Sequence, residues 1–501
     1  MKSKISGKTR DDRAKMRILL ACSAGMALLL SGCGAPMKVT STPVVPAAKG
    51  TVMGGQQPLP GVNLQFYTTA TASPGSYGSA AVPYGPAFAT NPGTGSFSFP
   101  TLQPCPAGSE VFLVGSDGDP VTFAANNTYI KLMVGLGSCS TFTANNALPS
   151  YHIVLNELTT VATIWSLGGF MTGPTNIGAP TSNATGLQNA FATINELVNV
   201  STGKAVSTLV PSGTTLPLDR FYALGDILQN CINSNGGSPS DPVNGTNVGS
   251  ACDNLMFLTT LPSTTAPTDI ATAAMNIAQH PGGNVAKVSN ADYLSDLYNL
   301  QGEPIGRAFP NNLTSPPTDW TLAINYTAGG LASPQSVAVD GFGNVWVTNN
   351  PSPGSGGSVT ELTVTSTATS APVYTGNNYT AHVNSPYGVA IDTGNNAWIT
   401  NTGDSSITMF GPGGASPANY NSESIGLSTP EGIAIDGAGN IWAVNNFTST
   451  LSGMTGLPSP GTPLANSPYG GVGQPGGLNG PSSIAVNPIA ASSPVPSVVR
   501  K

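Results

Sequence analysis

The residues best suited to chemistry recur at one fixed spacing in the C-terminal half of the chain. An aspartate is followed by an asparagine four positions later and by a tryptophan six positions later, in three copies. The copies are Asp340, Asn344 and Trp346; Asp392, Asn396 and Trp398; and Asp436, Asn440 and Trp442. A calcium loop needs several oxygen ligands close together, and each copy offers one acid. We therefore predict that these residues hold tight turns, with ion binding as the alternative, and we predict no metal site.

Catalysis by a general base would require a titratable side chain beside a suitable partner. His382 is the only histidine after residue 300, and it stands alone on an expected loop. The acids around it show no paired spacing; they are Glu361, Asp404, Glu423 and Glu431. The sequence also lacks a G-x-S-x-G elbow, an H-E-x-x-H motif, a P-loop, and a G-x-G-x-x-G motif before a helix. We therefore predict no catalytic residue and no cofactor.

Charge is scarce and unevenly distributed along the 501 residues, of which 8% are charged. Between Ala308 and Val499 there is no lysine or arginine, whereas eight acids are present. Binding to nucleic acid depends on bases that neutralise phosphates, so we predict no nucleic-acid partner. Capture of other anions by ion pairs is excluded for the same reason. Neutral glycans, proteins or peptides, and cations remain as ligands.

Four cysteines remain once the N-terminal segment is set aside, namely Cys105, Cys139, Cys231 and Cys252. An even number in an exported chain indicates disulfides, and three pairings are possible. We favour Cys105 with Cys139 and Cys231 with Cys252, because each bond then stays within one expected domain. Metal binding is the alternative, although it normally uses cysteines and histidines at closer spacing.

The N-terminal segment combines bases with a short apolar run. Seven lysines and arginines lie in residues 1–17, and the apolar run from Ile18 to Leu30 has thirteen residues. A membrane-spanning helix needs about 20 residues, so the run fits a signal peptide better. The run ends in Leu30-Ser31-Gly32-Cys33, which resembles the lipobox of bacterial lipoproteins.

That resemblance implies a signal peptide over residues 1–32, a lipid on Cys33 and a tether over residues 33–49. The lipid would then attach the chain to the membrane. An aspartate after the cysteine resembles an inner-membrane retention signal, but this chain has Gly34 there. We therefore expect the bacterial cell envelope, at the outer membrane or the cell surface. An ordinary secretory signal with a chance cysteine, or a short membrane anchor, is the alternative.

Three expected domains must position these residues. Residues 50–150 contain alternating apolar and polar segments, such as Val62–Tyr67 and Ser96–Phe99, which are typical of half-buried strands. The order GTVMGGQQPLPGVNLQFY, TNPGTGSFSFP and EVFLVGSDGD resembles the carboxypeptidase-regulatory or transthyretin-like β-sandwich, an Ig-like module. Residues 151–310 change to helical periodicity and predict a small α-helical domain. The predicted helices cover Asn156–Leu167, Leu187–Val198, Phe221–Ile232 and Thr268–Gln279, the last with Thr268 as its N-cap.

Residues 317–501 contain the repeats SPQSVAVDGFGNVWVTN, SPYGVAIDTGNNAWITN and TPEGIAIDGAGNIWAVN, and a partial copy, GPSSIAVNP. Their prolines, Pro334, Pro386, Pro430 and Pro481, are 52, 44 and 51 residues apart. A period of about 40–50 residues with strand–turn–strand content predicts the blades of a β-propeller. The repeats resemble NHL-repeat propellers, a family close to the streptogramin lyases. We expect an incomplete propeller of about four blades, either small and open or shortened.

The complete order of segments resembles NHL-repeat lipoproteins of environmental bacteria such as acidobacteria, and this resemblance implies an architecture without an activity. We therefore expect a multidomain, lipid-anchored binding or scaffold protein whose propeller engages a protein or a neutral glycan. One alternative is a propeller enzyme similar to streptogramin lyases or to hydrolases. Another is a shortened paralogue with little activity.

Overall fold

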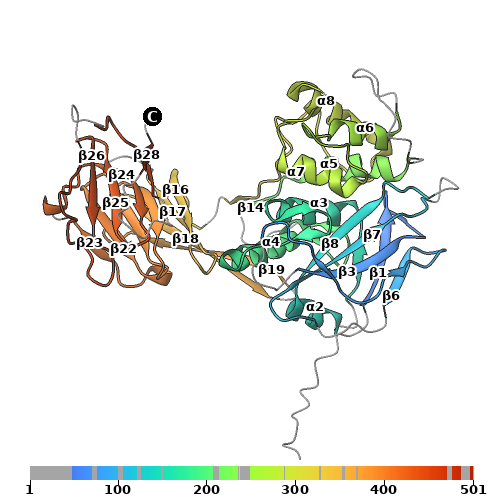
Figure 1. Ribbon diagram of the computed structural model, residues 1–501, viewed down its shortest axis with the longest axis horizontal. Coiled ribbons are helices and arrows are strands. Elements are labelled where there is room, and N and C mark those ends of the chain that lie inside the picture. Colours follow the sequence, from blue (N-terminus) through green and yellow to red (C-terminus); the bar gives the residue numbers. More distant parts are fainter. Residues whose placement is uncertain are drawn as a thin grey trace, which may run out of the picture. The chain divides into compact units, whose positions relative to one another are not determined.

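The computed structural model describes residues 48–69, 76–99, 105–120, 126–147, 151–206, 214–234, 236, 249–286, 288–326, 329–351, 356–367, 370–421, 423–470, 477–486 and 497–499. The predicted signal peptide, Cys33 and most of the predicted tether lie outside these ranges. The strands and helices fall into an N-terminal part, Ala48–Tyr326, and a C-terminal part that begins at Pro334 (Figure 1). In the described ranges, no helix combines the length and the hydropathy that crossing a bilayer requires.

The N-terminal part contains two larger β-sheets. In the first, β1 (Ala48–Gly54) pairs antiparallel with β2 (Gln57–Pro58) and β6 (Ser96–Phe99), and parallel with β9 (Ile153–Leu155). In the second, β3 (Asn63–Thr68) pairs antiparallel with β4 (Val82–Pro83), β5 (Phe88–Ala89) and β7 (Glu110–Ser116), and β7 pairs with β8 (Lys131–Ser138). Alternate side chains of β3 are buried, as its apolar–polar pattern predicts. The rings of Phe66 and Phe99, one from each sheet, lie 5.9 Å apart, so the two sheets pack against each other.

Seven α-helices are described in the same part. They are α2 (Cys139–Asn146), α3 (Glu157–Leu167), α4 (Ala184–Leu197), α5 (Leu218–Ile232), α6 (Ala251–Leu258), α7 (Ile270–Gln279) and α8 (Asn290–Leu300). The four predicted helices correspond to α3, α4, α5 and α7. Three pairs of short antiparallel strands lie in the segments between these helices and after them. They are β10 (Met171–Gly173) with β11 (Asn176–Ile177), β12 (Val198–Asn199) with β13 (Lys204–Ala205), and β14 (Thr214–Thr215) with β15 (Asn325–Tyr326).

The predicted N-cap of α7 is wrong by one residue. Asp269, not Thr268, has the extended backbone of an N-cap, and its carboxylate accepts a hydrogen bond from the backbone N–H of Thr272 at 2.8 Å. The same carboxylate pairs with Lys131 Nζ at 2.7 Å. A carboxylate satisfies the free N–H groups and the positive end of the helix dipole better than a hydroxyl does, and here it also gains an ion pair.

The strands and helices of the N-terminal part share one hydrophobic core. Its cluster of buried side chains includes residues from both of the ranges 50–150 and 151–310. The contact is close between β8 and α3, where the hydroxyls of Thr160 and Thr163 accept hydrogen bonds from the backbone N–H groups of Met133 and Gly135, each at 2.9 Å. Where this part divides into domains therefore stays a prediction.

The C-terminal part consists of consecutive antiparallel sheets. Sheet 1 contains β16 (Pro334–Val339), β17 (Val345–Asn349), β18 (Ser358–Thr367) and β19 (Ser370–Tyr379). Sheet 2 contains β20 (Pro386–Ile391), β21 (Ala397–Asn401), β22 (Ser406–Phe410) and β23 (Ala418–Tyr420). Sheet 3 contains β24 (Pro430–Ile435), β25 (Ile441–Asn445) and β26 (Thr450–Met454), and sheet 4 contains β27 (Ser483–Ala485) and β28 (Ser497–Val499). Each repeat proline begins, or lies just before, the first strand of its sheet.

Each of these sheets has two chemically different faces, because successive residues of a strand point to opposite sides. The aliphatic face carries the valines and isoleucines of the first strand region; they are Val337 and Val339, Val389 and Ile391, Ile433 and Ile435, and Ile484 and Val486. The alanine face carries Ala338, Ala390, Ala434 and Ala485. In sheets 1 to 3 the repeat tryptophan is paired with that alanine across the first two strands.

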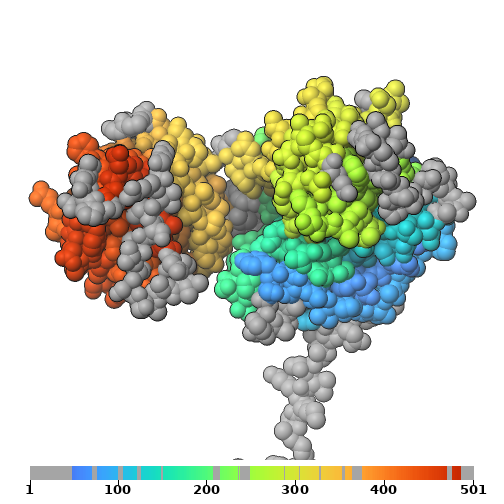
Figure 2. All heavy atoms as spheres, turned by 45° about the horizontal axis from the view of Figure 1, so that its top comes forward, coloured from blue at the N-terminus to red at the C-terminus, as the bar shows by residue number. Residues whose placement is uncertain are grey.

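The sheets are stacked in chain order, with the aliphatic face of one on the alanine face of the sheet before it. Trp346 shares a buried cluster with Val389, Trp398 shares one with Ile433, and Trp442 shares one with Ile484. The first strands β16, β20, β24 and β27 lie next to one another in this order. Figure 2 shows the gold, orange and red atoms of this part packed together. The three junctions therefore repeat one packing pattern.

Candidate functional site

The aspartate of each repeat lies just after the first strand and holds the turn that follows. In sheet 3, Asp436 Oδ1 accepts hydrogen bonds from the backbone N–H groups of Ala438 and Asn440, and Oδ2 accepts from Asn440 Nδ2 and Trp442 Nε1, all at 2.9 Å. Burial alone would raise the pKa of Asp436, but these hydrogen bonds together lower it. Each oxygen of the carboxylate therefore already accepts two hydrogen bonds from residues of the same repeat.

The other two copies have the same geometry. Trp346 Nε1 donates to Asp340 Oδ2 at 3.1 Å, and Trp398 Nε1 donates to Asp392 Oδ2 at 2.9 Å. The side-chain amides of Asn344 and Asn396 donate to the same two carboxylates. Each turn thus places its aspartate within hydrogen-bonding distance of the indole N–H of a buried tryptophan. Within the described ranges, no group of three or more histidines, cysteines and acids is arranged to hold a metal ion.

A second set of asparagines, which the sequence analysis missed, lies at the end of each second strand. Asn349, Asn401 and Asn445 are fully buried. In sheet 3 the side chain of Asn445 donates to the hydroxyl of Ser452 at 2.9 Å and accepts from the backbone N–H of Ser428 at 2.9 Å. The pattern was visible in the sequence as VTN, ITN and AVN, each followed by a strand with alternating serines and threonines.

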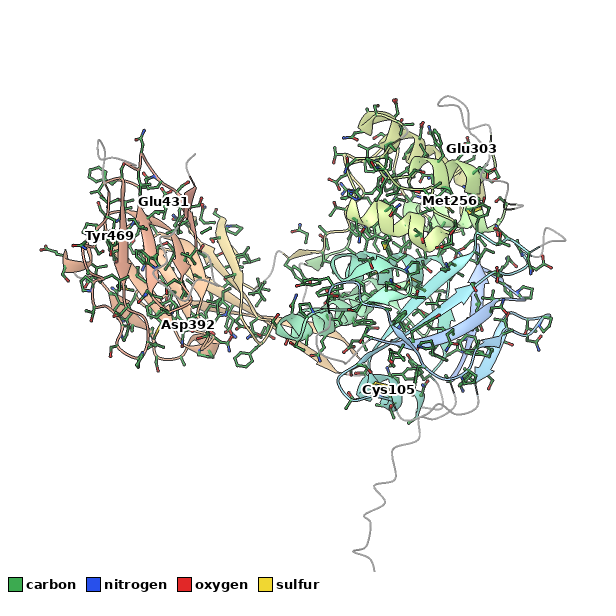
Figure 3. The ribbon with its side chains drawn as sticks, in the orientation of Figure 1. Cys105, Met256, Glu303, Asp392, Glu431 and Tyr469 are labelled. Carbon is green, nitrogen blue, oxygen red and sulfur yellow. A yellow bond between two sulfur atoms is a disulfide. The ribbon has the colours of Figure 1, made fainter. Side chains whose placement is uncertain are left out.

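A row of side chains lies at the opposite end of the sheets from these aspartates. Each member directly follows a repeat proline; the row comprises Gln335, Tyr387, Glu431 and Ser482. Figure 3 labels Glu431 and Asp392 at the two opposite ends of the C-terminal part. Gln335 is exposed and the other three are half-buried. We call these four residues the first-strand row.

One glycine and two threonines bring members of the first-strand row together. A Cβ on Gly388 would lie 2.5 Å from the carbonyl oxygen of Glu431, so only glycine allows β20 and β24 this close approach. The hydroxyl of Thr348 donates to the carbonyl of Tyr387 at 2.7 Å, and the hydroxyl of Thr400 donates to the carbonyl of Glu431 at 2.5 Å. In sheets 1 and 2 a threonine therefore holds, by a hydrogen bond, the backbone of the row residue in the next sheet.

The electrostatics of the row favour neutral or cationic groups. Burial raises the pKa of Tyr387, and the nearby charge of Glu431 raises it further, so the phenol stays protonated and can donate a hydrogen bond. The row contains hydrogen-bonding groups, an aromatic ring and a carboxylate, but no base. An anionic ligand would meet no compensating charge from these four side chains.

The other acids considered as catalytic candidates, Glu361, Asp404 and Glu423, lie in three different places of the C-terminal part. Glu361 is buried in sheet 1, where it accepts hydrogen bonds from Tyr379 Oη at 2.7 Å and Asn344 Nδ2 at 3.3 Å. Asp404 accepts a hydrogen bond from Ser406 Oγ at 2.7 Å in the connection between β21 and β22. Glu423 is exposed in a short helical turn. The structure thus does not gather these acids into one site.

His382 contributes its backbone rather than its ring. Its φ is +58°, and its carbonyl accepts hydrogen bonds from Asn401 Nδ2 at 3.3 Å and Thr408 Oγ1 at 2.5 Å. Gly426 has the equivalent position in the next sheet, with a φ of +73° and the same use of its carbonyl. The imidazole of His382 is exposed, so this position requires a left-handed backbone and not a histidine.

Replacing His382 with glycine is therefore expected to raise the stability of the C-terminal part. A left-handed backbone costs a residue with a Cβ roughly 1 kcal/mol, and glycine removes that strain. The expected gain in the free energy of unfolding is about 0.5 kcal/mol, because glycine also increases the freedom of the unfolded chain. His382→Ala is the matched control, since it removes the ring but keeps the strain. An equal gain in both variants, measured by urea unfolding, would show that the ring and not the backbone was responsible.

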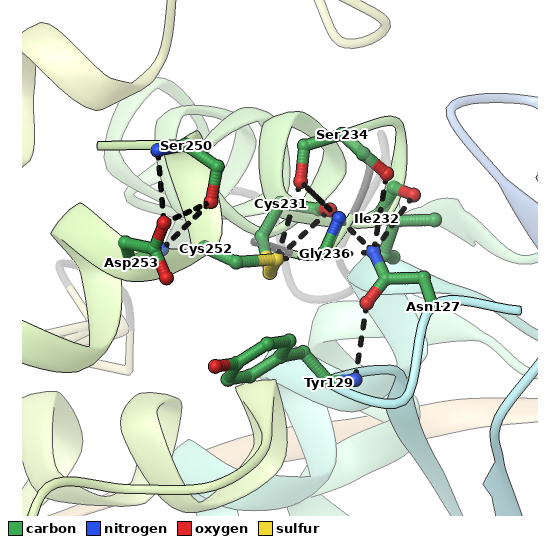
Figure 4. Close-up of a disulfide and its surroundings, with 9 residues drawn as sticks. All are labelled: Asn127, Tyr129, Cys231, Ile232, Ser234, Gly236, Ser250, Cys252 and Asp253. Carbon is green, nitrogen blue, oxygen red and sulfur yellow. Dashed lines mark hydrogen bonds between the residues drawn. A yellow bond between two sulfur atoms is a disulfide. The ribbon is translucent and has the colours of Figure 1, made fainter. Parts of the chain in front are cut away.

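Both predicted disulfides are confirmed. Cys105 bonds with Cys139, and Cys231 bonds with Cys252. The second bond joins α5 to α6 and lies beside Asn127, whose side-chain amide donates to the carbonyl of Cys231 at 2.8 Å (Figure 4). The carbonyl of that side chain accepts from the backbone N–H of Tyr129 at 3.0 Å. Asn127 therefore connects the strand region before β8 to the linked pair of helices.

Three buried carboxyl groups of the N-terminal part also escaped the sequence analysis. Burial raises the pKa of Glu157 to about 7, and the charge of Asp226 contributes in the same direction. Burial raises the pKa of Asp226 to about 6, although hydrogen bonds from Phe309 and Asn311 partly offset it. Burial also raises the pKa of Glu110 to about 7. Sequence periodicity could not reveal this, because the burial depends on contacts between distant segments.

The comparisons with known proteins find partial structural similarity only. No protein-family model and no curated protein matches the chain. A streptogramin B lyase structure is 18% identical, with a TM-score of 0.24, and the match covers 32% of this chain and 48% of that one. Selenomethionine-substituted virginiamycin B lyase from Staphylococcus aureus is 17% identical, with a TM-score of 0.24, and the match covers 32% of this chain and 46% of that one.

A third similar structure is a catalytically inactive variant of virginiamycin B lyase from Staphylococcus aureus with quinupristin. It is 15% identical, with a TM-score of 0.23, and the match covers 34% of this chain and 64% of that one. The matches therefore span about half to two thirds of the lyases. Similarities this weak transfer no activity to the present chain.

Proposed function

We propose that the protein is a lipid-anchored binding protein of the bacterial cell envelope, and that its C-terminal part is an incomplete NHL-type propeller that engages a neutral glycan or a protein. The N-terminal part would combine a carboxypeptidase-regulatory-like β-sandwich with helices and act as a support. The repeated sheets, their stacking in chain order and the adjacent first strands support the propeller interpretation.

The observation that carries the binding proposal is the first-strand row. Tyr387 offers an aromatic face with a protonated hydroxyl, and Gln335 and Glu431 offer further hydrogen-bonding groups. Neutral sugars are bound by this combination, because the ring covers their apolar C–H surface and the polar groups pair with their hydroxyls. The absence of lysine and arginine from residues 308–499 argues against anionic ligands.

The test is binding to an array of neutral glycans and to peptides, with the purified full chain. We expect Tyr387→Ala to weaken binding to the captured ligand at least tenfold, because it removes the aromatic face. Leu457→Ala is the matched control, since that exposed side chain follows β26 at the end of the sheets that carries the aspartates. Equal affinity of the Tyr387→Ala chain and the unaltered chain would reject the row as the binding site.

The proposed lipid anchor has a separate test. The disulfides support an oxidising compartment outside the cytoplasm. The Leu30–Cys33 motif supports lipidation at Cys33. Labelling with radioactive palmitate is expected in the full chain and not in Cys33→Ala. Persistent label in Cys33→Ala would refute the anchor without affecting the binding proposal.

A further inference from the structure

The aliphatic face of sheet 1 is exposed, although the same face is buried in the sheets that follow. Val337 is 62% exposed and Val339 is 60% exposed. The equivalent Val389 in sheet 2 is 8% exposed, and Ile433 in sheet 3 is 9% exposed. The difference arises from packing, since Val389 and Ile433 lie against the tryptophan of the preceding sheet. In the described part of the chain, no sheet covers sheet 1 in this way.

The opposite end of the stack has the complementary surface. In sheet 4, Ile484 and Val486 pack against the cluster of Trp442, so the aliphatic face is covered. Ser483 and Ala485, on the alanine face of the same strand, are exposed. In sheets 1 and 2 the equivalent Ala338 and Ala390 are partly buried against the aliphatic residues of the next sheet. Sheet 4 thus offers small side chains like the alanines that an aliphatic face partly covers elsewhere in the stack, with Ser497 in place of the tryptophan.

We propose that the aliphatic face of sheet 1 packs on the alanine face of sheet 4 in a second copy of this chain. The contact resembles the junctions between sheets 1 and 2 and between sheets 2 and 3, where β-branched side chains of one first strand lie near the alanine of another. Sheet 4 has Ser497 paired with Ala485 where those sheets have the repeat tryptophan. Both faces are exposed within a single copy, so the chain does not join them to each other. A contact between two different faces is heterologous. It forms a closed ring when two copies contact each other twice, and an open chain of copies when each copy contacts a new one.

Charge is consistent with this partner. The contacting side chains, Val337, Val339, Ser483 and Ala485, are neutral, so no charge has to be buried. The C-terminal part of each copy nevertheless carries acids and no base before Arg500. The two copies therefore repel each other weakly at a distance, and added salt is expected to strengthen the association by screening that repulsion.

Sedimentation velocity of the full chain in non-ionic detergent tests the proposal. The unaltered chain is expected to shift from monomer to larger species as its concentration rises. Val339→Asp and Ala485→Asp each place a charge in one face, and each is expected to weaken self-association at least tenfold. Phe447→Asp is the matched control, because it puts the same charge at a side chain that is 81% exposed and belongs to neither face.

Mixing the two variants distinguishes this contact from any other. The Val339→Asp copy keeps an intact alanine face, and the Ala485→Asp copy keeps an intact aliphatic face, so the mixture is expected to form a dimer. Monomers in the mixture, or a monomeric unaltered chain at every concentration, would overturn the proposal.

A cysteine pair provides a test that changes the fold less. In the chain carrying Val337→Cys and Ala485→Cys, oxidation is expected to link two copies, which a non-reducing gel shows as a dimer. The chain carrying Phe447→Cys and Ala485→Cys is the control and is expected to stay monomeric. A disulfide between positions 337 and 485 of the same copy of this double variant would also overturn the proposal, because sheets 1 and 4 of one chain would then contact each other.

Discussion

Replacing Asp436 with alanine is expected to lower the free energy of unfolding of the C-terminal part by about 3 kcal/mol or more. The substitution removes the acceptor for four hydrogen bonds, one of them from the indole of Trp442. A hydrogen bond to a charged group contributes about 1.5–3 kcal/mol, and the indole N–H left behind on Trp442 is buried. The measurement is urea unfolding followed by tryptophan fluorescence.

Two further variants make the Asp436 prediction specific. Asp436→Asn keeps one acceptor oxygen and loses the charge, so its cost is expected to be roughly half. Asp404→Ala removes an exposed carboxylate with a single described hydrogen bond, and its effect is expected to stay within about 0.5 kcal/mol. Equal effects of Asp436→Ala and Asp404→Ala would contradict the account of the turn.

The second large effect is a loss of stability as the pH rises, to which the buried Glu157 contributes together with Glu110 and Asp226. The pKa of Glu157 is about 7 in the folded chain, against an ordinary value of 4.5. The folded chain therefore binds more protons than the unfolded chain between these values, and the free energy of unfolding falls as the pH rises through this window. Since one pKa unit corresponds to about 1.4 kcal/mol, the fall due to Glu157 is roughly 3 kcal/mol.

Glu157→Gln is expected to remove the part of this pH dependence that Glu157 contributes. Glu157 Oε1 accepts a hydrogen bond from the backbone N–H of Gly55 at 2.5 Å, and glutamine keeps this acceptor. Glu157 Oε2 is buried without a hydrogen-bond partner among the described residues, which explains why the charge is costly there. The variant is expected to be about 3 kcal/mol more stable above pH 7 and little changed below pH 4.5.

The control for this pH dependence is Glu303→Gln, because Glu303 is an exposed acid of the same part. Its unfolding curves at a series of pH values should follow those of the unaltered chain. If Glu157→Gln also followed them, Glu157 would not be a source of the slope. Asp226 and Glu110, whose pKa values are also raised, would then become the residues to test.

The sequence predicted what local patterns control. Helical periodicity located α3, α4, α5 and α7, and cysteine spacing led to the correct disulfide pairing. The repeat spacing located the start of each sheet in the C-terminal part. These features depend on neighbours within a few tens of residues, so a single sequence contains most of the information.

The sequence did not predict what distant contacts control. Glu157 resembles an ordinary acid in the first turn of a helix, where it would favour the helix dipole. Its burial follows from the packing of α3 against a strand end about 100 residues earlier, at Gly55. The first-strand row likewise depends on how closely β20 and β24 approach, which no local pattern specifies.

The threonine hydrogen bonds that join successive sheets are present at two of the three junctions. Thr348 ties sheet 1 to sheet 2, and Thr400 ties sheet 2 to sheet 3. At the equivalent position before sheet 4 the chain has Val444, whose side chain has no hydroxyl to donate. The junction between sheets 3 and 4 therefore lacks this hydrogen bond and depends on apolar packing, in which Val444 shares a buried cluster with Trp442 and Ile484.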